Sequence, residues 1–418
     1  MSSFTQHVRR FAVDTRPLRH AAYRRMWLGT AFSFLGFQLT AVAVPFEMFE
    51  LTRDSFWVGL LGLAALVPLL IFALWGGAIA DAVDRRRLLL VSSLVTWSAT
   101  LGLLVQALLR AGSPHLLLAL TALQSMAVAV SMPTRQAIVP RLVEPDEVPA
   151  ANTLNFTVSN AAMVFGPLAA GLVLALWSPA VGLCVAYGVD AVLFTATLWA
   201  TWRLPPLPPE NHVPGVRAVG WRSIGEGIRF LLTTPVLVLS FLIDIVAMVL
   251  AMPRALFPEV AATHFGGGAA IGWLYSAIAI GSVLGGLTSG WIGRVRRQGL
   301  ALVVAVVCWG VAVALAGLAR DLWLMVALLA VAGCADLISA VYRQTMLQLI
   351  APDALRGRLQ GVFTAVVAGG PRLGDLRAGA MAATWGITFS WVSGGIAAAV
   401  VAVLVALAFP ALIRYPRR

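Results

Sequence analysis

The chain has 418 residues, of which 60% are hydrophobic and only 11% are charged. A soluble globular chain carries about 25% charged residues, so this composition excludes a soluble single-core protein and indicates an integral membrane protein. The net charge of +12 would also fit a nucleic-acid-binding protein, but the basic residues lie in short clusters between apolar runs, and no soluble basic domain is large enough to hold a duplex.

A polar, basic arm occupies residues 1–25 (MSSFTQHVRRFAVDTRPLRHAAYRR) and precedes the first apolar run. A cleaved signal peptide would place its apolar stretch earlier and would end at small residues. We therefore expect a cytoplasmic arm that leads into an uncleaved first membrane helix.

Twelve apolar runs follow this arm, most of them about twenty residues long, which is enough to cross the hydrocarbon core of a bilayer. Continuous apolar runs of this length predict helices rather than the short, alternating strands of a membrane barrel. The runs lie near residues 26–46, 56–80, 88–109, 115–132, 150–176, 179–201, 235–253, 269–292, 299–319, 322–341, 360–383 and 387–412. The sequence thus predicts an all-α integral membrane protein with twelve transmembrane helices.

The arginines indicate how these helices are oriented. All 30 basic residues are arginine, and most of them lie in segments that share one side of the membrane if the N-terminus is inside. Cytoplasmic loops carry an excess of positive charge. The few exceptions are Arg53, Arg110, Arg254 and Arg320 on the opposite side, and Arg372 and Arg377 within the eleventh run. We expect a multi-pass protein of the bacterial inner (cytoplasmic) membrane with both termini in the cytoplasm.

The chain divides into two similar halves. A Pro- and Gly-containing cytoplasmic linker at residues 204–222 separates six-helix bundles at 1–203 and 223–418. The stretch GGAIADAVDRRRLLL (residues 76–90) aligns with GGLTSGWIGRVRRQG (residues 285–299), and Arg135 aligns with Arg343 at nearly the same offset. Two independent matches at nearly one offset indicate an internal duplication, which is typical of transporters that move one half against the other.

The loop between the second and third runs resembles the signature of the major facilitator superfamily. The matching residues are Gly77, Ala80, Asp81, Arg85 and Arg86. The stretch departs from the pattern at Asp84, where Gly is usual, and at Ala82, where a basic residue is common. The resemblance covers essentially the whole chain and implies the major facilitator fold, with two pseudo-symmetric six-helix halves.

Several further segments are similar to the enterobactin-type siderophore exporters of that superfamily, among them VAVPFEMFELT, IGWLYSAIAIGSVLGGLTSGWI and PRLGDLRAG. This resemblance implies a monomeric, proton-coupled exporter that works by alternating access on a siderophore or a similar bulky secondary metabolite. Two alternatives remain open: a multidrug or antibiotic efflux pump of macrolide or tetracycline type, and a membrane scaffold or sensor that transports nothing.

The opening of the signature predicts a gate between the halves. Gly76 and Gly77 allow a neighbouring helix to approach closely, and Asp81 at the cytoplasmic end of the second helix can neutralise the positive end of a facing helix. The resemblance implies that this helix is the eleventh, so Arg356 and Arg358 are expected partners. Alternatively, the arginine run only fixes the topology, and Asp81 offsets its charge.

Charged residues inside the apolar runs are candidates for proton or substrate contact, because charge at membrane depth is costly. In the eleventh run, Arg372 and Asp375 are three residues apart and are expected to pair, beside a helix break or bend at Pro371. Asp375 is our first candidate for a proton-binding carboxylate, and a static ion pair is the alternative.

Other intramembrane charges have weaker predicted roles. Asp244 and Asp336 lie near the middle of their runs and are either proton or substrate contacts or buried structural residues. Asp190 is a less favoured candidate of the same kind, and Glu47 and Glu50 are expected to be solvated residues at the membrane rim. Arg135 and Arg343 are symmetry-related gate candidates whose side chains would otherwise extend to the cytoplasmic surface.

The sequence predicts no enzymatic activity. The chain contains no lysine for a nucleotide-binding loop of the Gly-Lys-Ser/Thr type. Its five histidines and three cysteines form no metal-ligand or disulfide pattern. We therefore expect neither a cofactor nor a metal, and the predicted partners are a small-molecule substrate, protons and the lipid bilayer, but not nucleic acid.

Overall fold

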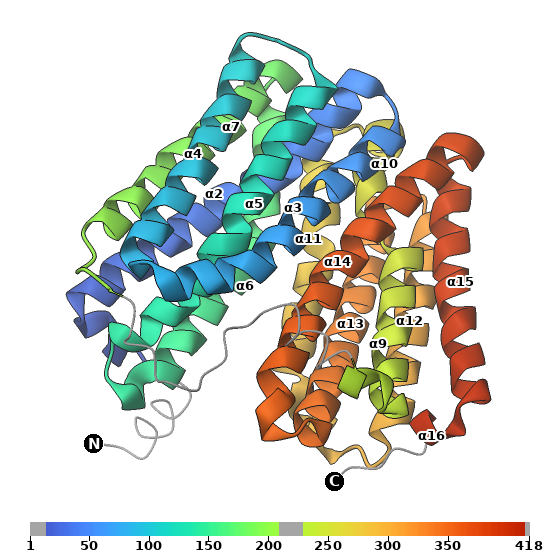
Figure 1. Ribbon diagram of the computed structural model, residues 1–418. Helices are drawn as coiled ribbons and strands as arrows, with labels where there is room; N and C mark the ends of the chain where they lie inside the picture. Colours follow the sequence, from blue (N-terminus) through green and yellow to red (C-terminus); the bar gives the residue numbers. More distant parts are fainter. Residues whose placement is uncertain (1–13, 209–228, 414–418) are drawn as a thin grey trace, which may run out of the picture.

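The computed structural model describes residues 14–208 and 229–413, and within these ranges the side chains at 73–82, 353–354, 356–358 and 411 are left undescribed. The described residues form helices and no strand. Figure 1 shows two bundles of long helices side by side. We call the end at which α2 begins and α15 ends the base of the molecule, and the opposite end the top.

The first bundle contains six long helices that run alternately up and down. They are α2 (Ala21–Thr52), α3 (Ser55–Ala82), α4 (Arg85–Leu108), α5 (Pro114–Ile138), α6 (Val148–Leu176) and α7 (Pro179–Trp202). Within it, α2 packs on α6 and α7, α3 packs on α5, and α4 packs on α5 and α7.

The second bundle repeats this arrangement. Its long helices are α9 (Pro235–Ala251), α11 (Gly268–Leu287), α12 (Gln298–Leu318), α13 (Leu322–Ile350), α14 (Asp353–Trp385) and α15 (Ile387–Ala408). Two short helices, α10 (Phe257–His264) and α16 (Pro410–Ile413), and the 3-10 turn η4 (Arg254–Leu256) complete it. The bundles meet where α3 packs on α14 and α6 packs on α11.

Every predicted run corresponds to one long helix, so the twelve-helix prediction is confirmed. Eleven helices in the described part of the chain are long and apolar enough to cross a membrane. The twelfth, α14, has 33 residues and carries Arg372, Asp375 and Arg377 in its middle, which lowers its hydropathy. Several helices extend beyond the apolar runs into polar turns, as α13 does at its end, to Ile350, and α14 does at its start, from Asp353.

Local sequence sets several of the helix ends. Asp84 caps α4 by accepting a hydrogen bond from the Arg87 amide at 3.0 Å, and Asp321 caps α13 in the same way through the Leu324 amide at 2.9 Å. Arg53 ends α2 in a left-handed conformation, with φ of 52°. Helix α14 is continuous through Pro371, so the predicted break is wrong, while the alternative of a bend stays a prediction. In this turn Arg372 Nη1 donates to the Ala368 carbonyl at 2.6 Å.

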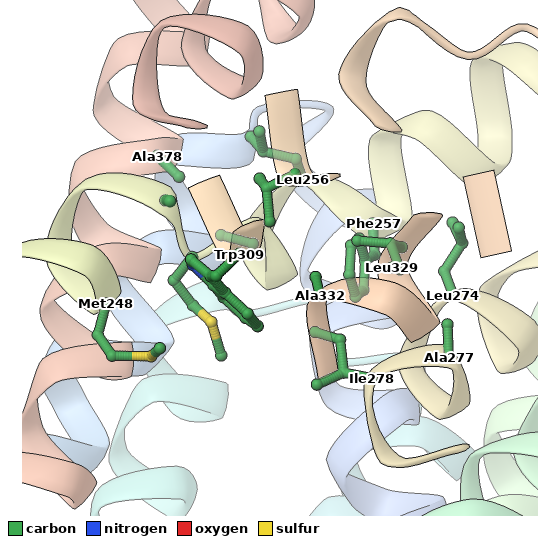
Figure 2. Close-up of a cluster of buried hydrophobic side chains, with 14 of the residues drawn as sticks. Met248, Leu256, Phe257, Leu274, Ala277, Ile278, Trp309, Leu329, Ala332 and Ala378 are labelled. Carbon is green, nitrogen blue, oxygen red and sulfur yellow. The ribbon is translucent and has the colours of Figure 1, made fainter. Parts of the chain in front are cut away.

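The core of the second bundle holds the segment between α9 and α11 in place. Figure 2 shows Leu256 and Phe257 among buried side chains that include Trp309 of α12 and Leu329 of α13. The Phe257 ring lies edge-on to the Tyr275 ring, with 5.1 Å between centroids. Leu256 and Phe257 are both fully buried, so the backbone of η4 is anchored although it links two helices at the top.

Candidate functional site

A cavity of about 240 Å³ lies between the two bundles. Residues of α2, α3 and α6 line it from the first half, and residues of η4, α11 and α14 line it from the second. Its polar side chains are those of Gln38, Arg254, Tyr275 and Asp375, and its apolar lining includes Val42, Leu61 and Met163. A partly polar cavity at the interface of two repeats is where transporters of this architecture bind their substrates.

Close helix contacts join the two halves beside this cavity and toward the top of the molecule. A Cβ atom on Gly59 of α3 would lie 2.6 Å from the Asp375 carbonyl oxygen of α14, and one on Gly171 of α6 would lie 2.7 Å from the Gly272 Cα of α11. The Ser276 hydroxyl also bridges the halves, donating to the Val164 carbonyl at 2.8 Å. Only glycine allows these backbones to approach so closely.

A polar contact joins the halves at the extreme top. The Ser55 hydroxyl, at the start of α3, donates to the Glu259 carboxylate of α10. Toward the base the two bundles diverge, as Figure 1 shows. The structure is therefore closed at the top and spread at the base.

The predicted ion pair of Arg372 and Asp375 does not form. Both side chains are described, and no guanidinium nitrogen lies within 4 Å of a carboxylate oxygen. Helical side chains tilt toward the N-terminus of their helix, and Arg372 reaches back to Ala368 rather than toward Asp375. Asp375 Oδ1 accepts a hydrogen bond from the Ala255 amide at 3.2 Å. This bond fixes the Asp375 carboxylate at the cavity wall, beside η4.

Three other predicted residues come together in the second half. Arg343 of α13 forms an ion pair with Asp244 of α9, and its second guanidinium nitrogen lies 3.8 Å from Asp336 Oδ1. The Arg343 and Asp244 side chains are only 3% and 4% exposed, whereas that of Asp336 is 32% exposed. Arg343 therefore does not extend to the surface, and it holds two carboxylates from separate helices.

The symmetry-related Arg135 makes an analogous connection in the first half. Arg135 Nη1, on α5, donates to the Thr30 hydroxyl of α2 at 2.5 Å. In both halves the fourth helix thus sends an arginine to the first. In the described part of the chain no acidic side chain forms an ion pair with Arg135, so a charged cluster is found at this position in the second half and not in the first.

The described residues of the signature form hydrogen bonds to other segments of the first half. Arg85 Nη1 donates to the Ala137 carbonyl at 3.2 Å, and Arg86 Nη2 donates to the Trp202 carbonyl at 2.6 Å. Asp84, which departs from the family pattern, also accepts from the Leu207 amide at 3.0 Å. These bonds fix the start of α4 against the ends of α5 and α7. The packing around Gly76 and Gly77 and the side chains of Asp81, Arg356 and Arg358 lie outside what the structure describes.

Two acidic residues lie in the core of the first half. Glu47 accepts from the Gln106 amide and the Tyr187 hydroxyl, each at 2.6 Å, and it is 5% exposed. The prediction of a solvated rim residue is therefore wrong for Glu47, because α4 and α7 cover this face of α2. Asp190 is also buried, and the Thr40 hydroxyl donates to its carboxylate at 2.6 Å.

Gln38, Arg254 and Tyr275 are cavity residues that the sequence did not single out. Arg254 was counted only as an exception to the orientation rule, and nothing in its local sequence distinguishes it from Arg320. Neutral residues such as Gln38 and Tyr275 give no signal of their own in a membrane helix. The described residues contain no group of three or more His, Cys, Asp or Glu side chains that could hold a metal.

Comparison with known proteins identifies relatives over nearly the whole chain. The family model described as transmembrane secretion effector matches residues 12–414. The enterobactin exporter of Shigella boydii serotype 18 is 29% identical over 401 residues, which cover 95% of this chain and 94% of that protein. The enterobactin exporter of Escherichia coli O139:H28 gives the same identity and coverage.

Solved structures of membrane transporters share the fold. The nucleoside transporter NupG superposes with a TM-score of 0.73 at 16% identity, covering 94% of this chain and 99% of that one. A bacterial homologue of the lysosomal transporter Spinster, in an inward-facing and unoccupied conformation, has a TM-score of 0.71 at 17% identity, covering 96% and 97%. A bacterial homologue of the iron transporter ferroportin, in an inward-facing state, has a TM-score of 0.67 at 16% identity, covering 92% and 98%.

Proposed function

Because the chain belongs to the transmembrane secretion effector family of the major facilitator superfamily, we propose that it is a proton-driven exporter of a siderophore or a similar bulky secondary metabolite. Its two halves, residues 1–203 and 223–418 joined by 204–222, rock about the central cavity by alternating access. The relatives named as enterobactin exporters support both the direction and the substrate class.

The cluster of Asp244, Arg343 and Asp336 is the observation that carries proton coupling. When both carboxylates are ionised, the cluster has one negative charge in excess. Arg254 is the other arginine within electrostatic range of Asp336, and it offsets this charge from beyond ion-pair distance. A proton bound within the cluster removes the excess charge locally. Asp336 is far more exposed than Asp244 and lies farther from the guanidinium, so we assign the mobile proton to Asp336 and a permanent ion pair to Asp244 and Arg343.

Asp375 keeps a separate role in this proposal. Its carboxylate lies in the cavity wall and is bound by the Ala255 amide, so it contacts substrate rather than carrying the coupling proton. This assignment differs from the expectation based on sequence, which favoured Asp375 over Asp336. The charged cluster around Arg343 supports the change.

The closed top and the diverging base support one state of the transport cycle. With both termini in the cytoplasm, the base faces the cytoplasm, and in this state the cavity receives substrate from the cytoplasmic side. In the opposite state, Asp81 contacts the start of α14 near Arg356 and Arg358 and closes the base.

Fusions to the C-terminus test the orientation of the chain in the membrane. We expect an alkaline phosphatase fusion to be inactive and a green fluorescent protein fusion to fluoresce. The reverse pattern would contradict the topology.

The proposed function is tested by deleting the gene and growing the strain under iron limitation. Mass spectrometry of cells and medium is expected to show a metal-chelating metabolite that is retained in the cells and depleted outside. Complementation with the wild-type gene, but not with Asp336→Asn, should restore export, and Asp336→Glu should restore part of it. An unchanged metabolite profile in the deletion strain would remove the siderophore assignment, and a toxicity panel on the same strain would then test drug efflux.

A further inference from the structure

Arg254 points to a property of the substrate that the family resemblance does not provide. Its side chain lines the cavity between the two halves. Within the described part of the chain, this guanidinium has no hydrogen bond or ion pair to another side chain or to the backbone. Only the backbone carbonyl of Arg254 is engaged, by the Tyr275 hydroxyl at 3.3 Å.

The backbone that carries this guanidinium is fixed by its neighbours. Leu256 and Phe257, two and three residues further along the chain, are fully buried in the core of the second half. The Ala255 amide between them and Arg254 is bound to Asp375 Oδ1. The backbone next to Arg254 is therefore anchored both by buried side chains and by a hydrogen bond to α14, and this anchored segment carries the arginine at the cavity.

An arginine in this setting favours an anion. The guanidinium is permanently charged and offers five N–H donors in a planar fork that matches a carboxylate. Charge inside a membrane protein that has no partner is costly and marks a functional site. The charged groups within electrostatic range of Arg254 are Arg372 and Asp375 on α14 and Asp336 on α13. In the described part of the chain, neither carboxylate forms an ion pair with the Arg254 guanidinium, which remains available to a ligand.

The remaining lining defines what accompanies the anionic group. Gln38 of α2 faces the cavity from the opposite half, and its side-chain amide has no hydrogen bond within the described part of the chain. Val42, Leu61 and Met163 provide an apolar surface beside it. The volume of about 240 Å³ is below the roughly 300–1,000 Å³ that is usual for sites enclosing a drug-sized ligand, so the cavity holds only part of a bulky substrate.

We infer that this cavity is a subsite for an acidic group of the transported molecule and that Arg254 is the residue that selects it. The substrates are then organic acids with an aromatic or aliphatic portion next to the acid, rather than basic drugs. This inference rests on the proposed transport function and names the substrate class of the same site.

The test measures binding to the purified full-length protein without any gradient. The probes are 1-naphthylacetate and its neutral amide, 1-naphthylacetamide, which have nearly the same shape and differ in charge. We expect the wild-type protein to bind the acid at least about tenfold more tightly than the amide, a difference of about 1.4 kcal/mol. Arg254→Gln should bring the two affinities together, and Arg254→Lys should keep part of the preference.

Arg320→Gln is the matched control, because Arg320 is an exposed arginine at the same end of the molecule and does not line the cavity; its preference should equal that of the wild type. Equal affinity of the wild type for acid and amide, no binding of the acid at millimolar concentration, or an unchanged preference in a folded Arg254→Gln protein would each overturn the inference. If Arg254→Gln does not fold, the wild-type ratio and the Lys variant decide. Export without any acid preference would leave the proposed function intact and remove only this inference.

Discussion

The charged side chains in the middle of α14 do not form the pair that their spacing along one helix predicts. Sequence spacing predicted that Arg372 and Asp375 pair, since they share a helix face, but each bonds to a backbone group instead. The pair that does form, Arg343 with Asp244, joins residues of two helices far apart in the chain. Sequence reasoning identified both members as unusual because they are charged in apolar runs, but it could not match them, since helix rotation and packing are tertiary properties.

The Arg343 cluster predicts a specific pattern of stabilities. Arg343→Gln leaves Asp244 and Asp336 without their cation, and removing one partner of a buried pair costs about 3–5 kcal/mol. We expect a clearly lower midpoint of thermal unfolding for the purified protein. Adding Asp244→Asn should recover part of the loss, because it removes the uncompensated charge. Equal midpoints for the wild type and Arg343→Gln would contradict the cluster.

Glu47 and Glu50 provide a second comparison at the residue scale. Glu47→Ala leaves the Gln106 amide and the Tyr187 hydroxyl without their acceptor, and each unsatisfied buried group costs about 1–3 kcal/mol. Glu50 pairs at 2.7 Å with Arg53, whose side chain is largely exposed, and an exposed pair contributes about 0–1 kcal/mol. Thermal unfolding of both alanine variants should therefore show a much larger loss for Glu47→Ala, and equal losses would mean that Glu47 is solvated after all.

At the scale of helices, the sequence predicted which helices exist better than it predicted where they end or which neighbouring helices they contact. Every apolar run became one helix, because membrane depth sets a minimum length for each. The ends were less accurate, since capped, polar turns such as the one at Asp84 continue a helix beyond its apolar part. Gly59 and Gly171 were not predicted as contacts, because a glycine in the sequence does not reveal which neighbouring helix approaches it.

The glycine contacts predict how the top is closed. Gly59→Ala would place a Cβ atom 2.6 Å from the Asp375 carbonyl oxygen, so α3 and α14 must separate. We expect a cysteine introduced at Ala255, which is 2% exposed and lines the cavity, to react several-fold faster with a hydrophilic maleimide applied from the top side. The assay uses a background without the native cysteines.

Gly188→Ala is the control for this experiment, because its added Cβ would meet only the Leu104 side chain, at 3.9 Å. Labelling in that variant should match the parent protein. If Gly59→Ala also labels at the parent rate, the close approach of α3 and α14 does not seal the cavity.

At the scale of the whole molecule, the duplicated sequence predicts the duplicated architecture. The motif that repeats around Arg135 and Arg343 places an arginine between the first and fourth helices of each half. The halves differ in what that arginine meets: a hydroxyl in the first and two carboxylates in the second. This asymmetry is the basis for placing proton coupling in the second half, and it could not be derived from the repeat alone.

The central claim, that a proton gradient drives export through this cluster, is tested most directly in everted membrane vesicles. The measurement is uptake of the metabolite that the deletion strain retains, with the pH gradient imposed or collapsed by nigericin. We predict uptake into wild-type vesicles only while the gradient exists, and none above empty-vector vesicles for Asp336→Asn. Wild-type uptake that is unchanged after the gradient collapses, or wild-type rates in the Asp336→Asn vesicles, would contradict the account.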